Sequence, residues 1–280
     1  MELKFISEIT TQYDSFTKVF RKIADYILKD YMQLPFLSIQ EVANATSVSP
    51  ASIHRFCIQL GYPGFSAFQR EVQVFMQKNL AETESEEYRN WKQSGNSILQ
   101  KQIDLNTTVL QEMLNEDLAI NFDKSVEAIQ KAKRVYIIGL RASYGIAALL
   151  YNLLHEYMDN VYLLTLGIDD IYDHIANINS DDLLFSIGFK AYTKYTVEII
   201  KQFHKMGAVT ITLTDKYTSP LAFNSDICLI PGNTTPSYGF VMAVTIVKAL
   251  SVAINNIHDP EILKLYERKQ DLLLENDILI

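Results

Sequence analysis

Apolar residues in the first 80 positions recur every three or four residues, which is the spacing of amphipathic helices. One such pattern runs from Phe16 to Tyr31, and a second follows the turn at Tyr62, Pro63 and Gly64. The inward face of the second pattern holds Phe65, Phe68, Val72 and Phe75. We therefore expect residues 1–80 to form a compact, all-helical domain of about five helices.

Between these two patterns, the stretch from Ser38 to Gly61 predicts two short helices joined by a tight turn. Ser38 and Ser49 are placed to cap the two helices, and Pro50 suits the first turn of the second. Gly61 is expected to end the second helix. The buried stripe of that helix is expected to hold Ile53, Phe56 and Leu60.

The spacing of Ala43, Ser47 and Ile53 is typical of a helix-turn-helix, in which the second helix enters a DNA major groove. Ser47 stands where glycine is usual, so its backbone has to be left-handed at some energetic cost. The side chains expected to face the groove are Ser49, Pro50, Ser52, His54, Arg55 and Gln59. A pair of packed helices without DNA binding is the alternative interpretation of this pattern.

Residues 81–97 are polar and acidic and show no sustained apolar period, so we interpret residues 81–106 as a linker between two domains. Trp91 in this linker is expected to pack against a neighbouring domain or subunit. Helical spacing resumes from Ile98 to Leu118, and a further helix is predicted to begin near Asn121 and to end at Lys133.

From residue 134 onward, short apolar runs alternate with helical patterns, as in a parallel sheet with helices on both faces. The expected strands are Val135–Ile138, Val161–Leu164, Leu183–Ile187, Val209–Leu213 and Ile227–Ile230. The expected helices are Tyr144–Met158, Asp169–Ile178, Lys194–Lys205, Tyr238–Asn256 and Glu261–Leu274. We therefore expect residues 107–280 to form an α/β domain with a doubly wound, five-stranded parallel sheet.

The chain has 280 residues, 48% of them hydrophobic, which is enough for two folded domains. Its formal net charge of −8 is unevenly divided. The first 80 residues carry eight Lys and Arg against seven Asp and Glu, so the acidic excess lies entirely in the remainder. Attraction to phosphates therefore belongs to the first segment, and the acidic remainder favours solubility.

Several features of the sequence indicate a cytoplasmic protein without membrane contact. No apolar run is long enough to span a bilayer, and the N-terminus lacks the basic-then-apolar order of a signal peptide. Cys57 and Cys228 each lie within an apolar pattern, so we expect two buried, reduced thiols.

In a parallel α/β sheet, ligands bind beyond the carboxyl ends of the strands, near the point where the strand order reverses. Gly139, Arg141 and Ser143 follow the first expected strand and directly precede a helix. Gly139 is expected to allow a tight turn, and Arg141 to add a positive charge. Ser143 is expected to cap the helix while its hydroxyl binds an anion. A capped turn with a solvated arginine is the alternative.

A second candidate loop, with Ser186, Lys190, Tyr192 and Thr193, follows the third expected strand. Ser186 and Thr193 offer hydroxyls, Lys190 offers a positive charge, and Tyr192 offers a ring and a phenol. The loop at 214–220 follows the fourth expected strand and is expected to line the same cleft.

Three stretches in this order resemble RpiR-type bacterial transcription regulators, which join an N-terminal helix-turn-helix domain to a C-terminal sugar isomerase (SIS) domain. They are SPASIHRFCIQLGYPGFSAF (residues 49–68), RVYIIGLRASYGIA (134–147) and GAVTITLTDKYTSPLAFNSDICL (207–229). The resemblance implies that Ser143 is the phosphate-binding serine of the family. Arg141 replaces the second glycine of the family's Gly-x-Gly-x-Ser pattern. Ser186 matches the first serine of a second motif, in which Gly188 stands where another serine is usual.

The resemblance implies a regulator that binds a double-stranded DNA operator as a homodimer or homotetramer and senses a small phosphorylated sugar or a related anion. The alternatives are a phosphosugar isomerase with a helical appendage, and a regulator whose degenerate SIS domain senses nothing. An isomerase needs a positioned Glu or His as general base. The candidate histidines, none of which forms a motif with a neighbouring acid, are His155, His174, His204 and His258. We therefore expect a regulator that is not an enzyme and needs no cofactor or metal.

Overall fold

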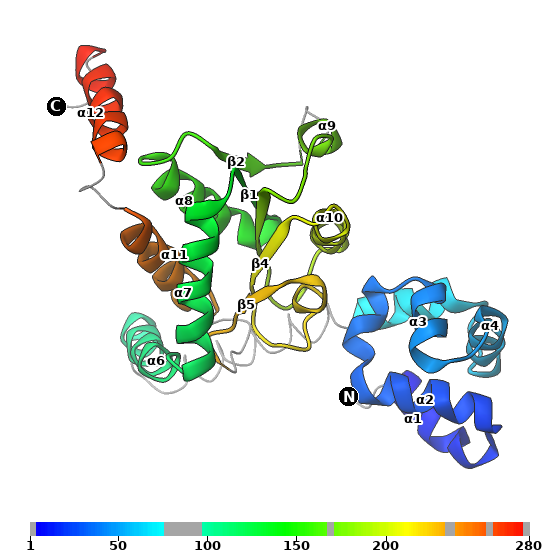
Figure 1. Ribbon diagram of the computed structural model, residues 1–280. Coiled ribbons are helices and arrows are strands. Elements are labelled where there is room, and N and C mark those ends of the chain that lie inside the picture. The colour runs from blue at the N-terminus through cyan, green and yellow to red at the C-terminus, as the bar shows by residue number, and fades with distance from the viewer. Residues whose placement is uncertain (1–3, 76–96, 167–170, 233–238, 256–259, 277–280) are drawn as a thin grey trace. The chain divides into compact units, whose positions relative to one another are not determined.

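A computed structural model of the chain divides into two compact units, Met1–Gly95 and Asn96–Ile280, here called the helical unit and the α/β unit (Figure 1). The residues that the structure describes are 4–75, 97–166, 171–232, 239–255 and 260–276. Trp91 and His258 lie outside these residues, as does most of the predicted linker.

The helical unit is built from short helices around an aromatic core. Its α-helices are α1 (Lys4–Gln12), α2 (Lys18–Asp30), α3 (Ile39–Thr46) and α4 (Pro50–Gln59), and residues 65–75 are also helical. Phe56 on α4 is fully buried and contacts the rings of Phe16 and Phe20 edge-to-face, at centroid distances of 5.3 and 5.4 Å. Aromatic pairs of this geometry stabilise a core beyond the area they bury, so they hold α4 firmly against α2.

The α/β unit begins with two helices and then alternates strands with helices. Its helices are α6 (Ile98–Glu112), α7 (Glu116–Lys131), α8 (Tyr144–His155), α9 (Ile171–Ile175), α10 (Lys194–Lys205), α11 (Gly239–Ile254) and α12 (Pro260–Glu275). Its strands are β1 (Arg134–Gly139), β2 (Val161–Leu164), β3 (Asp182–Ile187), β4 (Val209–Leu213) and β5 (Ile227–Leu229). A 3-10 turn, Arg141–Ser143, joins β1 to α8.

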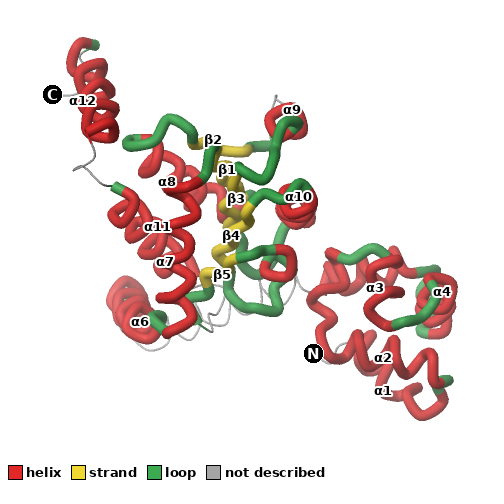
Figure 2. The backbone as a smooth tube through the Cα atoms, viewed as in Figure 1, coloured by secondary structure: helices red, strands yellow, loops and turns green. Residues whose placement is uncertain are grey.

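Within the described residues, all strand pairs of the sheet are parallel and the strand order is β2-β1-β3-β4-β5. Helices α7, α8 and α11 cover one face, and α9 and α10 lie on the other (Figure 2). The predicted doubly wound, five-stranded parallel sheet is therefore confirmed.

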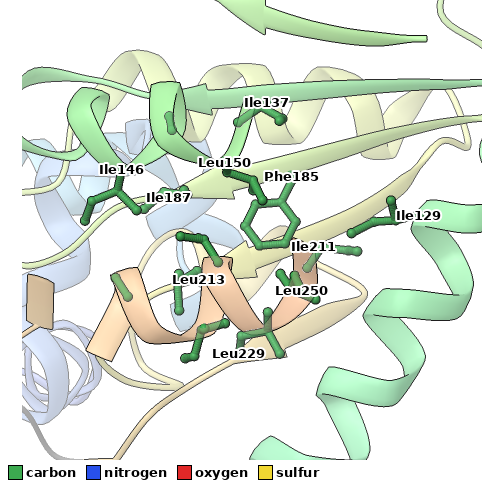
Figure 3. Packing of buried hydrophobic residues seen from close by; sticks show 14 of the residues in the cluster. Ile129, Ile137, Ile146, Leu150, Phe185, Ile187, Ile211, Leu213, Leu229 and Leu250 are labelled. Atoms are coloured by element: carbon green, nitrogen blue, oxygen red, sulfur yellow. The ribbon is translucent and has the colours of Figure 1, made fainter. Parts of the chain in front are cut away.

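The main core of the α/β unit lies between the sheet and the layer of α7, α8 and α11 (Figure 3). Phe185 of β3 is fully buried there, next to Ile137 and Leu250. Side chains alternate along a strand, so the neighbours of Phe185 point to the other face. Tyr136 shows this second layer, because its ring contacts Phe203 of α10 at 5.3 Å.

Several predicted boundaries were wrong, most of all at the start of the α/β unit. The pattern expected to run as one helix from Ile98 to Leu118 breaks after Glu112, and α7 begins at Glu116 rather than near Asn121. Asn115 causes the restart, because its side chain accepts a hydrogen bond from the Leu118 amide at 2.9 Å and caps α7. Residues 98–106, which were expected in the linker, form the first part of α6.

Candidate DNA-binding helix and candidate anion site

The caps predicted for α3 and α4 are confirmed. The Ser38 hydroxyl accepts a hydrogen bond from the Glu41 amide, and the Glu41 carboxylate accepts one from the Ser38 amide at 2.7 Å. Sequence reasoning missed this reciprocal capping box, although Ser and Glu at this spacing are its usual signal. Ser49 caps α4 by accepting from the Ser52 amide at 3.2 Å, and Pro50 is the first residue of α4.

The turn between α3 and α4 is tight, as predicted. Ser47 has φ 52° and ψ 45°, the left-handed conformation that the sequence indicated. The amide of Val48 donates to the carbonyl of Ala43 at 3.0 Å and closes the turn. Ala43 is buried where the two helices approach each other, so its small size is needed at this place.

Replacing Ser47 by glycine is expected to stabilise the helical unit by about 1 kcal/mol. The left-handed conformation costs a side chain with a Cβ about 1–2 kcal/mol, and the greater freedom of glycine in the unfolded chain offsets part of this gain. Hydrogen exchange of the buried amides of α3 and α4 measures the change. The matched control is Ser66→Gly within helical residues 65–75, which is expected to destabilise the unit by about 0.5 kcal/mol.

Not every predicted groove residue lies on the exposed face of α4. His54, Arg55 and Ser49 are exposed, and Pro50 is half-buried. Ser52 is buried, and its hydroxyl shares a hydrogen bond of 2.9 Å with that of Ser49. We therefore correct the groove-facing role of Ser52, because this residue completes the cap of α4 instead.

Two further contacts position exposed side chains of α4, those of Gln59 and His54. The Gln59 amide donates to Gln12 Oε1 of α1 at 3.3 Å, which holds Gln59 at the side of the helix. The imidazole of His54 packs directly against Gly64. A Cβ on Gly64 would lie 2.7 Å from His54 Cε1, so a side chain at this position would collide with the imidazole. Gly64 therefore makes room for His54 against the loop that follows α4.

Sequence reasoning missed two exposed residues of α4, Ala51 and Ile58. Ala51 is exposed, and the Ile58 side chain is 53% exposed despite its apolar character. Both share the helical face of His54 and Arg55, being separated from them by three or four residues. The exposure of Ala51 and Ile58 could therefore be predicted from the helical period of the sequence.

In the α/β unit, the two candidate loops leave the sheet at the point where the strand order reverses. The chain runs outward in one direction from β1 to β2 and in the other from β3 to β5. The last residues of β1 and β3, Gly139 and Ile187, are direct partners in the parallel register. The loops 140–143 and 188–193 therefore begin side by side, at the crevice where open α/β sheets bind ligands.

Gly139 is needed for close packing rather than for the tight turn that we expected. A Cβ on this residue would lie 2.6 Å from the carbonyl oxygen of Ser143 and 2.9 Å from Cβ of Ala147. The first turn of α8 therefore crosses the end of β1 at a distance that only glycine allows. The left-handed residue of the loop is Arg141, with φ 56°.

Replacing Gly139 by alanine is expected to destabilise the α/β unit by about 1–3 kcal/mol, because the new methyl group meets backbone atoms that cannot move aside. Gly145 in the first turn of α8 is the matched control, since a Cβ there meets nothing within 4 Å. Gly145→Ala is expected to stabilise α8 by several tenths of a kcal/mol. Urea unfolding followed by far-UV circular dichroism compares the two variants, and equal stabilities would contradict the assignment.

The loop after β1 presents Arg141 and holds Ser143 inward. Arg141 is exposed and adopts the conformation that suits the glycine of the resembling pattern. Ser143 is 7% exposed and, within the described residues, its hydroxyl caps no backbone amide of α8. The predicted capping role was wrong, because Ser143 closes the 3-10 turn with helical φ and ψ instead of the extended backbone of a capping residue.

Ser186 does not face the loop. It is fully buried, and its hydroxyl shares a hydrogen bond of 2.5 Å with that of Thr212. Thr212 in turn shares a hydrogen bond of 2.5 Å with Ser225, so these hydroxyls form a chain beneath β3 and β4. We therefore correct the ligand-binding role of Ser186, since its side chain alternates to the α10 side of the sheet.

The remaining polar groups of the second loop differ in their availability. The phenol of Tyr192 is buried and donates to Asp215 Oδ1 at 2.5 Å. The hydroxyls of Thr193 and Thr196 share a hydrogen bond of 3.0 Å at the start of α10. Among the described residues, half-buried Lys190 makes no hydrogen bond or ion pair. Lys190 and Arg141 are therefore the charged groups that the two loops can offer to an anion.

Among the described residues, the two cysteines and His204 do not form a catalytic site. Burial raises the pKa of the Cys57 thiol to about 12 and that of Cys228 to about 11, so neither is a thiolate at neutral pH. His204 Nδ1 lies 3.6 Å from Asp226, but this exposed pair stands at the amino ends of β4 and β5, away from the candidate loops. No group of acidic, histidine or cysteine side chains in the described part of the chain has the arrangement of a metal site.

Comparison with known proteins assigns both units. Residues 3–81 match the model of the helix-turn-helix domain of the rpiR family, and residues 128–253 match that of the SIS domain. An uncharacterized HTH-type transcriptional regulator of Haemophilus influenzae is 28% identical over 239 residues, covering 81% of this chain and 80% of that protein. One of Clostridium perfringens is 30% identical over 218 residues, 75% of each chain.

Among solved structures, the Vibrio vulnificus NanR protein complexed with ManNAc-6P matches with a TM-score of 0.60 at 20% sequence identity. The match covers 97% of this chain and 98% of that one, so the likeness extends over the fold of both units.

In the part of the chain that the structure describes, no helix is both long and apolar enough to cross a bilayer.

Proposed function

Because this chain belongs to the rpiR family of helix-turn-helix transcriptional regulators, we propose that it binds a symmetric operator as a homodimer and that its SIS domain changes operator affinity when a small phosphorylated sugar binds. The relatives are named as transcriptional regulators, and the chain is accordingly a regulator rather than an enzyme. Such a protein acts in the cytoplasm, where bacterial operators are found.

The observation that carries the sensing proposal is the position of two loops. The residues 140–143 and 188–193 lie together at the reversal of strand order, within a chain that also carries a helix-turn-helix. Arg141 and Lys190 supply positive charge there, and Gly139 allows the amino end of α8 to approach the sheet. Positive side chains beside a helix N-terminus favour a phosphate group.

The proposed homodimer is supported by the outer face of α11. This helix carries a single charged residue, Lys248, yet exposes Val244 (41%) and Val252 (64%). A helix that is apolar on all sides is normally buried. A second copy of the α/β unit would cover this face. The two-fold axis that relates the two chains of such a homodimer suits an operator with two half-sites.

Thermal-shift measurements of the full chain against sugar phosphates and amino-sugar phosphates test the sensing proposal. ManNAc-6P belongs in this panel, with inorganic phosphate and the unphosphorylated sugars as controls. A ligand that binds only the folded state at about 100 times its Kd stabilises it by about 2.7 kcal/mol, which raises the melting temperature by several degrees. The proposal expects a saturable shift with at least one sugar phosphate and none with its unphosphorylated form.

A regulator whose SIS domain senses no sugar phosphate is the second candidate. The hydrogen bonds of Ser186, Tyr192 and Thr193 favour it, because these groups already have partners within the protein. The absence of a shift across the panel, together with intact operator binding, would select this candidate over the first.

A further inference from the structure

The exposed face of α4 is apolar at its centre. Successive residues of an α-helix are rotated by about 100°, so Ala51 and Ile58 lie within roughly 20° of each other. On the same wheel, His54 borders this pair on one side, and Arg55 borders it on the other. The buried side chains Ile53, Phe56 and Cys57 occupy the opposite side, each at most 1% exposed. The direction that α4 presents away from its own domain is therefore an aliphatic strip between two cationic or polar side chains.

An exposed isoleucine alone carries little information, because folded proteins expose many apolar side chains. Ile58 differs by its neighbours. It stands one turn beyond Arg55 on the second helix of a helix-turn-helix, which is the element that enters the major groove. Ala51 lies in the first turn of α4, where recognition helices contact base edges, and Ile58 lies on the same face two turns further along the groove. The C5-methyl of thymine is the large apolar group on those edges.

We propose that Ile58, assisted by Ala51, reads thymine methyl groups in the operator beside the base that Arg55 contacts. This inference rests on the proposed function and adds to it a chemical requirement on the half-site. Arg55 supplies a guanidinium that suits guanine, whereas Ile58 supplies contact area that only a methylated base edge can fill.

The spacing along the helix predicts where the methyl groups lie. Ile58 is three residues beyond Arg55, or about 4.5 Å along the axis, and stacked bases are about 3.4 Å apart. A thymine read by Ile58 therefore lies one step from the base contacted by Arg55. Ala51 is four residues before Arg55, about 6 Å in the other direction, which corresponds to a second methyl about two steps away.

The test begins with an operator obtained by selecting the full-length protein on random duplexes. Each thymine of that operator is then replaced singly by deoxyuridine, which removes only the methyl group. Affinities are measured for the wild type and for Ile58→Ala. Val74→Ala serves as the matched control, because Val74 is 42% exposed in the same unit but lies on the helix 65–75.

The wild type is expected to lose about fourfold in affinity when the thymine read by Ile58 is replaced, the equivalent of burying one methyl group. Ile58→Ala is expected to bind the unmodified operator several-fold more weakly and to be indifferent to deoxyuridine at that position. Val74→Ala is expected to behave like the wild type. Melting temperatures of the variants confirm that each remains folded.

Two outcomes overturn the inference. In one, Ile58→Ala and deoxyuridine weaken binding independently at every position, so that Ile58 does not contact a thymine methyl. In the other, Ile58→Ala leaves the affinity for the unmodified operator unchanged. Failure of the proposed function looks different, since the selection then enriches no duplex sequence at all.

Discussion

Replacing Asp182 by alanine is expected to destabilise the α/β unit by about 3 kcal/mol, because it leaves the Arg134 guanidinium without its carboxylate partner. Asp182 is 1% exposed and accepts hydrogen bonds from Arg134 Nε at 2.8 Å and from a terminal nitrogen of Arg134 at 2.6 Å. It also accepts a hydrogen bond from the backbone N–H of Asn179 at 2.9 Å. The pair joins the first residues of the central strands β1 and β3, which are direct partners in the sheet.

Urea unfolding of the full chain measures this loss, and Asp181→Ala is the control. Asp181 is the adjacent acidic residue but is exposed, so its replacement is expected to change the free energy of unfolding by less than about 0.5 kcal/mol. Equal stabilities of the two variants would contradict the role of the buried pair.

The same pair predicts a dependence of stability on pH. Burial raises the pKa of the Asp182 carboxyl, but the hydrogen bonds from Arg134 and from the Asn179 amide outweigh this and lower the pKa overall. A carboxyl with a lowered pKa in the folded state adds stability above its unfolded pKa of about 3.9 and loses it as the pH falls through the folded value. The wild type is therefore expected to lose more stability on acidification than Asp182→Ala does.

Replacing Arg55 by alanine is expected to weaken binding to the selected operator by about 10- to 100-fold. A guanidinium that donates two hydrogen bonds to a guanine contributes about 1–3 kcal/mol of discrimination between bases. Arg55 is exposed on α4, and the buried contacts of Phe56 hold that helix in place independently of Arg55. The variant is therefore expected to keep the melting temperature of the wild type.

Two control variants distinguish contact of Arg55 with a base from a general effect of its positive charge. Arg70→Ala removes an exposed arginine of the same unit outside α4 and is expected to change operator affinity by no more than about twofold. Arg55→Lys keeps the charge but loses the planar fork, so it is expected to restore little of the specificity. An equal loss of affinity on operator and scrambled duplex would show that Arg55 contacts only phosphate.

The features that could be predicted from sequence are those set by local patterns. The caps at Ser38 and Ser49 depend on residues at most three positions away, and the left-handed Ser47 depends on the length of its turn. Each strand of the parallel sheet shows as a short run of Val, Ile and Leu between polar turns. The helix spacing was predicted less well near Leu114, which fits the apolar period but is 73% exposed after the break at Glu112.

The candidate site was harder to predict, because its residues are governed by contacts between distant segments. The hydroxyl of Ser186 is occupied by Thr212, a partner 26 positions away that only the register of β3 and β4 brings close. Glycine is required at position 139 because the first turn of α8 crosses the end of β1 closely, and the composition of the loop does not reveal this packing. Ile58 was missed because the expected groove face held only polar residues and Pro50, although its place in the helical period indicated exposure.

Operator affinity measured with and without the sugar phosphate that gives the largest thermal shift tests the central claim most directly. The claim is that an anion at the loops 140–143 and 188–193 controls DNA binding by α4. Coupling of this kind amounts to about 1–3 kcal/mol, so the account predicts a 5- to 150-fold change in operator affinity at saturating ligand. It also predicts no change with the unphosphorylated sugar. Operator affinity that stays the same at every concentration of every sugar phosphate would contradict it.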